Sequence, residues 1–197
     1  IRKLRSAFDH KGNFGRALLI AGSYGKMGAA VLSARAALRS GIGLLTVHVP
    51  ACGYSIMQTA VPEAMAQVDT HTDFFTAAPH PENYDAAGIG PGIGQNNDTV
   101  KAFGAFLEKC TRPLVIDADG LNILASRREY LQLLPKDSIL TPHPKEFERL
   151  AGIFKNDFHR LEKLKEFSAA TNAIVILKGA WSAVSFPEGA IHFNPTG

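Results

Sequence analysis

A strand-to-helix turn is predicted at Thr141-Pro142-His143-Pro144-Lys145-Glu146-Phe147. It follows a short apolar run at 138–140, typical of a buried strand, and leads into apolar residues at helical spacing. The two prolines fix φ at their own positions and favour extended backbone at the residues before them. His143 is therefore held on a stiff loop after a strand, which is where ligands bind in open α/β sheets. An ordinary surface histidine between two prolines would leave the same pattern, so the stretch alone leaves both interpretations open.

Strands and helices are predicted to alternate along the chain. Continuous apolar runs indicate strands at residues 16–21, 44–49, 85–89, 113–117, 138–140, 173–177, 183–186 and 190–193. Apolar residues at helical spacing indicate helices at 29–40, after Asp98 as the N-cap, at 121–125, and around Phe158, Leu161, Leu164 and Phe167. Residues 51–84 are weakly periodic, and only short elements are expected there.

This alternation predicts an α/β fold for residues 1–197 as a single domain. Strands that are apolar throughout are typical of a mostly parallel sheet with helices on both faces. The short strands near the end of the chain favour an antiparallel edge. With 197 residues, of which 46% are hydrophobic, the chain is long enough to bury one sizeable core.

Composition disfavours several classes of protein. The formal charge is +3 and no run of Lys or Arg exceeds two residues, so no nucleic-acid partner is expected. Cys52 and Cys110 have neither zinc-ligand nor disulfide-framework spacing, which favours a reducing compartment. No leader opens the chain and no apolar run approaches the roughly 20 residues of a membrane span. We therefore expect a cytoplasmic protein without a membrane partner.

Two glycine-rich loops each follow a predicted strand and precede a helix. In Gly22-Ser23-Tyr24-Gly25-Lys26-Met27-Gly28, free backbone N–H groups and the helix dipole would favour an anion. The loop is neither a Walker A motif nor GxGxxG, and glycines needed only for a tight turn would look the same. Gly90-Pro91-Gly92-Ile93-Gly94 would let a ligand approach the backbone closely, or would be a strained loop without a ligand.

Charged residues follow two further strands. Asp117-Ala118-Asp119-Gly120-Leu121-Asn122 would bind Mg²⁺ through water or a ligand hydroxyl, or would cap the next helix, and for Asp119 capping is the preferred role. Lys178 would meet a phosphate or remain an isolated exposed lysine. Because all these groups follow parallel strands, they are expected along one edge of the sheet, as a nucleotide-binding cleft.

Taken together, short motifs along nearly the whole chain resemble the ADP/ATP-dependent NAD(P)H-hydrate dehydratase family. They are His10-Lys11-Gly12, Ile20-Ala21-Gly22-Ser23, Gly28-Ala29-Ala30, Ala37-Leu38-Arg39-Ser40-Gly41, Gly90-Pro91-Gly92-Ile93-Gly94, Ile116-Asp117-Ala118-Asp119, Leu140-Thr141-Pro142-His143-Pro144 and Leu177-Lys178-Gly179. The resemblance implies a ribokinase-like fold with three α/β/α layers. It also implies a repair lyase that removes water from hydrated NADH or NADPH, with ADP or ATP as co-substrate, ADP being usual in similar bacterial members, and with Mg²⁺.

The family's binding residues are carried over by motif. The resemblance implies that the hydrated nicotinamide nucleotide contacts Ala29, Gly92, His143, Pro144 and Glu146. It implies that the adenine nucleotide contacts Lys178, Gly179, Ala180, Trp181, Ser182 and Asn194. Glu146 would also hold Mg²⁺ through water. His143 stands where sugar kinases of this fold have asparagine, which favours a dehydratase over a kinase.

The family's catalytic aspartate lies in a Gly-Asp dipeptide, and no such dipeptide occurs in the chain. The resemblance places this aspartate beyond Gly197, so no catalytic residue is assigned within the sequence. It predicts a C-terminally incomplete domain, lacking the Gly-Asp loop and the helices after it, with little or no activity. It further implies a homo-oligomer and fusion to an N-terminal NAD(P)H-hydrate epimerase domain. Two alternatives stay open: a kinase of the same fold acting on a sugar or hydroxymethylpyrimidine, and a non-catalytic nucleotide-binding fragment.

Overall fold

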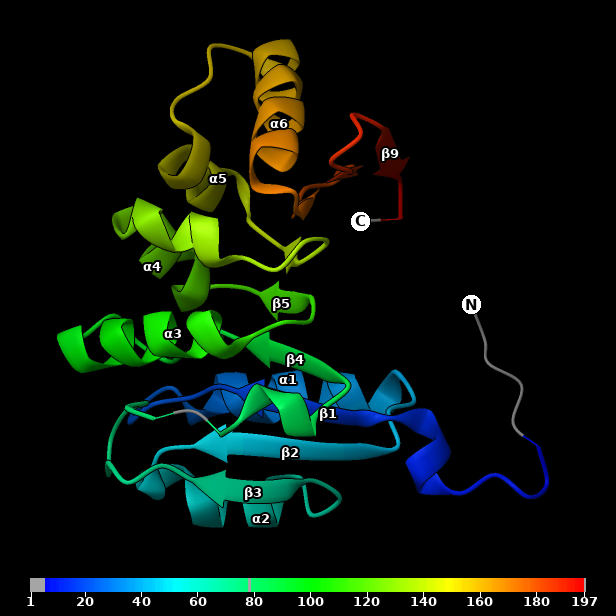
Figure 1. The fold of residues 1–197 in the computed structure, drawn as a ribbon, viewed down its shortest axis with the longest axis vertical. Coiled ribbons are helices and arrows are strands. Elements are labelled where there is room, and N and C mark those ends of the chain that lie inside the picture. Colours follow the sequence, from blue (N-terminus) through cyan, green and yellow to red (C-terminus); the bar gives the residue numbers. More distant parts are fainter. Residues whose placement is uncertain (1–5, 78, 197) are drawn as a thin grey trace.

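The structure, a computed structural model, describes residues 6–77 and 79–196. Within them, one sheet has the strand order β3-β2-β1-β4-β5-β6-β7-β8-β9. The strands are β1 (Arg16–Ile20), β2 (Leu44–Val49), β3 (Met65–Val68), β4 (Ala86–Ile89), β5 (Leu114–Ile116), β6 (Ile139–Leu140), β7 (Ile174–Leu177), β8 (Ser182–Ser185) and β9 (Ile191–Asn194). Figure 1 shows β3, β2, β1, β4 and β5 in this order from bottom to top.

All the strands from β3 to β7 in the sheet order pair in parallel, whereas β7–β8 and β8–β9 pair antiparallel. The predicted mostly parallel sheet with an antiparallel edge is therefore confirmed. The predicted strands agree with the observed ones to within about one residue at most ends.

The α-helices are α1 (Met27–Arg39), α2 (Tyr54–Ala60), α3 (Asn97–Lys109), α4 (Asp119–Ser126), α5 (Pro144–Ala151) and α6 (Asp157–Thr171). Short 3₁₀ helices are Lys11–Phe14, Ala51–Gly53, Pro81–Asn83 and Arg128–Leu133. No helix of the described residues is long and apolar enough to span a bilayer.

The helices form two groups on opposite faces of the sheet. Leu19 of β1 packs in a cluster with residues of α1, α2 and β2, whereas its neighbours Leu18 and Ile20 pack in a cluster with α3, α4 and β4–β6. Because successive residues of a strand point to opposite faces, α1 and α2 cover one face and α3 and α4 the other. A third cluster, containing Phe147 and Leu164, places α5 and α6 over β7 and β8.

Three details of the predicted helices were wrong. Asn96, not Asp98, caps α3: its side-chain oxygen accepts a hydrogen bond from Thr99 N–H at 3.0 Å. Helix α1 starts two residues before the predicted Ala29. Phe158 lies at helical spacing from Leu161 but is 81% exposed, because it is the second residue of α6 and points away from the sheet's core.

Candidate active site

Five loops lie together at the carboxyl ends of the parallel strands, which form one edge of the sheet. They follow β1, β4, β5, β6 and β7, and parallel strands end at the same edge. The predicted glycine-rich, acidic, histidine and lysine segments all belong to these loops. The cleft predicted from the sequence therefore has its elements on one side of the molecule.

The two glycine-rich loops are bonded to each other. Gly22 N–H donates to the Pro91 carbonyl at 2.8 Å, and Ser23 Oγ donates to the Gly92 carbonyl at 2.7 Å. Gly92 has φ +70°, and a Cβ on it would lie 3.1 Å from the Ala29 methyl group. The structure thus brings together Ala29 and Gly92, two residues predicted to bind the same ligand, on a surface built mainly of backbone.

Gly90 shows why the second loop needs glycine. Its φ is +130°, and a Cβ there would meet the Asp117 carbonyl oxygen at 2.0 Å. Any other residue would therefore separate the loop after β4 from the loop after β5. Glycine at this position keeps the two loops in contact.

Asp119 links these loops and does not cap a helix. It is the first residue of α4, whose N-cap is Ala118, so the predicted capping role was wrong. Its Oδ2 accepts from Gly94 N–H at 2.9 Å and from Lys26 Nζ at 3.3 Å. The carboxylate thereby ties the second glycine-rich loop to the start of α1.

Lys178 is paired and is not an isolated lysine. Its Nζ donates to Asp117 Oδ1 at 2.8 Å, and its backbone N–H donates to the Pro142 carbonyl at 2.9 Å. The side chain keeps 44% of its surface exposed, so it remains accessible to a ligand. Lys178 thus joins the ends of β5, β6 and β7.

His143 lies at the N-cap of α5. Its Nδ1 accepts from Lys145 N–H at 3.2 Å and from Glu146 N–H at 3.4 Å, and Glu146 Oε2 accepts from His143 N–H at 2.9 Å. In this reciprocal capping box Nδ1 is the acceptor, and Nε2 lies 3.5 Å from Glu146 Oε1. The backbone of His143 is extended, as the prolines predicted, and Pro144 is the first helical residue.

Glu146 is 6% exposed, and the capping box engages its carboxylate. Within residues 6–77 and 79–196, no three His, Cys, Asp or Glu side chains lie close enough together to hold a metal ion. Asp117 and Asp119 are each paired with a lysine. No three-ligand metal site is therefore assigned among the described residues, and the water-mediated role of Glu146 stays a prediction.

The predicted nucleotide-binding segment lines a hollow of about 470 Å³ beside β7 and α6. Lys178, Gly179, Ala180 and Trp181 contribute to its wall, together with Pro144 and Arg160. Trp181 is 66% exposed and offers an aromatic face. Ser182 and Asn194 are opposite each other across the β8–β9 pair, so the structure brings these two predicted residues together as well.

The catalytic aspartate was predicted in a loop beyond Gly197, and Gly197 lies outside the described residues. The nearest described turn follows β9, where Asn194 Oδ1 accepts from the Thr196 N–H and hydroxyl at 3.1 and 2.8 Å. None of the described residues therefore tests the prediction of a Gly-Asp loop after Gly197. It stays a prediction, and no catalytic residue is assigned among residues 6–77 and 79–196.

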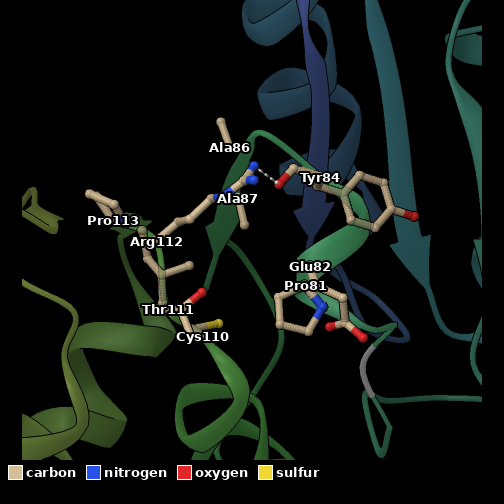
Figure 2. Close-up of a pocket in the computed structure, with 10 residues that line it drawn as sticks. Pro81, Glu82, Tyr84, Ala86, Ala87, Cys110, Thr111, Arg112 and Pro113 are labelled. Carbon is tan, nitrogen blue, oxygen red and sulfur yellow. Dashed lines mark hydrogen bonds between the residues drawn. The ribbon is translucent and has the colours of Figure 1, made fainter.

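Another cavity lies at the opposite edge of the sheet, before β4 and β5 (Figure 2). Its volume of about 20 Å³ has room for little more than one water. Arg112 Nη1 donates to the Tyr84 carbonyl there at 2.8 Å. Burial, with the nearby charge of Glu82, raises the pKa of the Cys110 thiol to about 12, which disfavours the nucleophilic thiolate form.

Sequence analysis missed several groups that shape the site. Lys26 and Ser23 were visible only as members of a glycine-rich loop. Asp69 and His48 form a buried pair 3.1 Å apart beside it, and a separation of 21 residues gave no recognisable motif. Arg149 Nε donates to Asn122 Oδ1 at 3.0 Å, which connects α5 to α4.

Fold and site together define a class: an α/β protein of ribokinase-like fold with two bonded glycine-rich loops at the carboxyl ends of its parallel strands. The structure matches a ribokinase-like superfamily protein from Enterococcus faecalis with a TM-score of 0.79, over 97% of this chain and 66% of that chain. The identity is 22%, so this similarity supports the fold alone. The predicted fold class is confirmed.

The family follows from the sequence. A family model described as NAD(P)H-hydrate dehydratase matches residues 17–197, and the chain belongs to this family. The predicted resemblance is therefore confirmed. It rests on the matched sequence, not on the fold that the family shares with other proteins.

Similar proteins show how much of a family member the chain represents. It is 36% identical over 198 residues to an ADP-dependent (S)-NAD(P)H-hydrate dehydratase from Bacillus subtilis, covering 98% of this chain and 68% of the relative. A crystal structure of the Bacillus subtilis ADP/ATP-dependent enzyme, co-crystallised with ATP and Mg²⁺, matches with a TM-score of 0.79 at 32% identity, over 98% of this chain and 68% of that one. A bifunctional NAD(P)H-hydrate repair enzyme, Nnr, from Moorella thermoacetica is 36% identical over 203 residues. That match covers 98% of this chain but only 38% of the longer relative.

Proposed function

We propose that the protein dehydrates hydrated NADH and NADPH with an adenine nucleotide, ADP, as co-substrate. Family membership supports the reaction class, and the relative from Bacillus subtilis is named as ADP-dependent. The observation that carries the proposal is the direct bonding of the two glycine-rich loops, with Ala29 against Gly92, beside the His143 turn. Backbone-lined surfaces of this kind suit a substrate whose reacting group must be aligned with a phosphate.

The chemistry that follows is a phosphorylation and an elimination. The ring hydroxyl of the hydrate attacks the terminal phosphoryl group of ADP, the bond between the two phosphates breaks, and AMP leaves. The ring nitrogen lone pair then expels inorganic phosphate, and loss of the neighbouring ring proton restores the double bond. The net reaction converts hydrate and ADP into the reduced cofactor, AMP and phosphate. Hydroxide would be a poor leaving group without the first step.

The residues take their proposed roles from the family motifs that they match. Ala29, Gly92 and His143, with Pro144 and Glu146, would hold the hydrated nicotinamide side. The segment 178–182, with Asn194, would hold the adenine nucleotide, since four of its members line the hollow beside α6. The proton acceptor is not assigned to a described residue of this chain.

The test is to incubate the full-length protein with hydrated NADH and ADP and to follow absorbance of the reduced nicotinamide. We expect recovery with ADP, slower recovery with ATP, and phosphate released in equal amount to the cofactor restored. A parallel assay offers a sugar and a hydroxymethylpyrimidine with ATP. Phosphorylation of either, with no recovery of cofactor from any nucleotide, would overturn the proposal in favour of a kinase.

Further proposals concern the whole protein. We propose a homo-oligomer and fusion to an N-terminal epimerase domain, both from the family resemblance, and a cytoplasmic location from the composition. Light scattering of the purified protein checks the first.

A further inference from the structure

Asp69 follows β3 and is buried, with 4% of its surface exposed. Its carboxylate accepts hydrogen bonds from the backbone N–H groups of Thr76, His71 and Ala77 at 2.8, 2.9 and 3.0 Å, and from the Thr76 hydroxyl. One side chain therefore shapes the whole loop 69–77 from inside. A carboxylate with this many donors is held in a single orientation.

His48 of β2 contacts Asp69 in the interior of the protein. Its Nε2 lies 3.1 Å from Asp69 Oδ2, and the imidazole is 4% exposed and packs edge-on against Phe75, with ring centres 5.9 Å apart. Burial lowers the pKa of His48, opposed by the hydrogen bond and charge of Asp69, so the ring is neutral and donates its Nε2 proton. Burial alone would raise the pKa of Asp69, but the hydrogen bonds from Thr76, His71 and Ala77 hold it well below its usual range.

The outer side of loop 69–77 holds the active-site loops. The Asp73 carbonyl accepts from Tyr24 N–H, in the middle of the first glycine-rich loop, at 2.7 Å. The Phe75 carbonyl accepts from Thr99 Oγ1, in the first turn of α3, at 2.8 Å. Helix α3 follows the second glycine-rich loop. Loop 69–77 thus contacts the loop that leads into α1, which carries Ala29, and the first turn of α3, which follows the loop that carries Gly92.

The same loop also holds the segment after β2. The His71 and Thr72 carbonyls accept from the N–H groups of Ala51 and Cys52 at 3.0 and 2.9 Å. Each outward bond uses a backbone carbonyl within two residues of an N–H that bonds Asp69. The Phe75 carbonyl shares its peptide group with the Thr76 N–H, and the other three belong to His71 and the two residues after it. Losing the carboxylate would therefore release all of these contacts together.

We propose that Asp69, with His48 beneath it, is a positioning residue that fixes the first glycine-rich loop for binding of the hydrated nicotinamide nucleotide, and this inference rests on the proposed function. Asp69 touches no ligand in this arrangement. It acts through loop 69–77 and the Tyr24 amide on a surface whose binding groups are backbone atoms. Such groups cannot adjust by changing rotamer, so a small shift of the loop is expressed directly as lost affinity.

Asp69→Asn tests this inference. The substitution hardly changes the volume of the side chain, but the amide nitrogen cannot accept the hydrogen bonds from the backbone N–H groups. We expect the Kd for hydrated NADH to rise about 10- to 100-fold and the Kd for ADP to change by less than about twofold. Asp85→Asn is the matched control. Asp85 also accepts a backbone bond, from Arg16 N–H at 2.9 Å, but at the opposite edge of the sheet. Equal losses for both ligands in Asp69→Asn would reduce Asp69 to a structural role and overturn the inference.

A milder variant and a ligand-free measurement keep the test decisive. Thr76→Val removes the hydroxyl bond to Asp69 but keeps the backbone bond, and we expect a smaller loss of the same selective kind, restored in Thr76→Ser. Hydrogen exchange of the Tyr24 amide should be at least about tenfold faster in Asp69→Asn, with exchange in β5–β7 unchanged. An unchanged Tyr24 amide would refute the inference. Failure of the unaltered protein to bind hydrated NADH would refute the proposed function instead, and the exchange result would still stand.

Discussion

Strands β2 and β5 are both internal parallel strands, yet their surroundings differ. In β2, Val47 is fully buried under α1 and α2, and on the opposite face Thr46 and His48 are 8% and 4% exposed. In β5, Leu114 and Ile116 are buried beneath the helices of one face, but Val115, on the other face, is 44% exposed. Among residues 6–77 and 79–196, one strand is covered on both faces and the other on one.

The difference continues along the sheet. The residues that share the face of Val115 in the neighbouring strands are only half-buried, namely Ile139, Ile174, Ile176 and Val184. Composition would have ranked the two strands the other way, because β5 is wholly apolar and β2 contains threonine and histidine. A polar strand can therefore be the better covered one when a loop such as 69–77 supplies its hydrogen bonds.

The largest expected effect on stability comes from placing a carboxylate in β2, at Val47, and in β5, at Val115. Val47→Asp buries an unpaired carboxylate and should lower the free energy of unfolding by more than about 4 kcal/mol. Val115→Asp keeps its carboxylate near water and should cost about 1 kcal/mol. Urea unfolding followed by circular dichroism measures both. Similar costs would show that the two strands are equally covered.

The part of the sheet around β2 should also lose more stability in acid than the part around β5. The folded-state pKa of Asp69 is depressed, so its stabilisation is fully present above the ordinary aspartate pKa. This stabilisation is lost as the pH falls below that value towards the depressed folded-state pKa. The folded-state pKa of His48 is lowered too, so protons bind preferentially to the unfolded chain once the pH falls below about 6.5. Both groups make the protein less stable as pH falls.

The measurement for this pH effect is urea unfolding at pH 7.5, 5.5 and 4. His48→Phe should lose less stability between pH 7.5 and 5.5 than the unaltered protein does. His192→Phe is the control, because His192 is exposed on β9 at the other end of the sheet. An unaltered pH dependence in His48→Phe would show that His48 does not contribute.

The smallest effect on stability is expected at the two lysine–aspartate ion pairs of the site, Lys26–Asp119 and Lys178–Asp117. Lys26→Met and Lys178→Met each remove a partly exposed ion pair and should cost less than about 1 kcal/mol of unfolding free energy. Their effects on binding should differ, because Lys26 adjoins the glycine-rich loops and Lys178 lines the nucleotide hollow. We expect Lys178→Met to weaken ADP about tenfold, and Lys26→Met to weaken hydrated NADH by a similar factor. Calorimetric titration with each ligand separates the two, and the reverse pattern would contradict the assignment.

Much of the fold could be predicted because it depends on local patterns. The strand at 44–49 was predicted to the residue, and the turn at Thr141–Phe147 was predicted from two prolines, each of which acts on its own and the preceding φ and ψ. Family motifs led to Ala29 and Gly92, which the structure then placed in contact. These are features in which a short stretch of sequence contains its own physical cause.

The remaining features depend on partners far apart in the chain. Asp119 reads as a helix cap by spacing, but it bonds Lys26, 93 residues away, because the ends of β1 and β5 meet at the same edge. Lys178 reads as a free lysine until Asp117, 61 residues away, is brought beside it. Neither pairing has a local signature.

The sequence by itself determined the order of strands and helices outside residues 51–84, the glycines at which the backbone turns, and the family. Only the tertiary structure decided which carboxylate faces which lysine, that Asp69 shapes the loop beside Tyr24, and that Val115 meets solvent while Val47 does not. The reason is physical. Backbone preference acts over a few residues and can be inferred from them, whereas burial and ion pairing depend on which distant segments the sheet brings together.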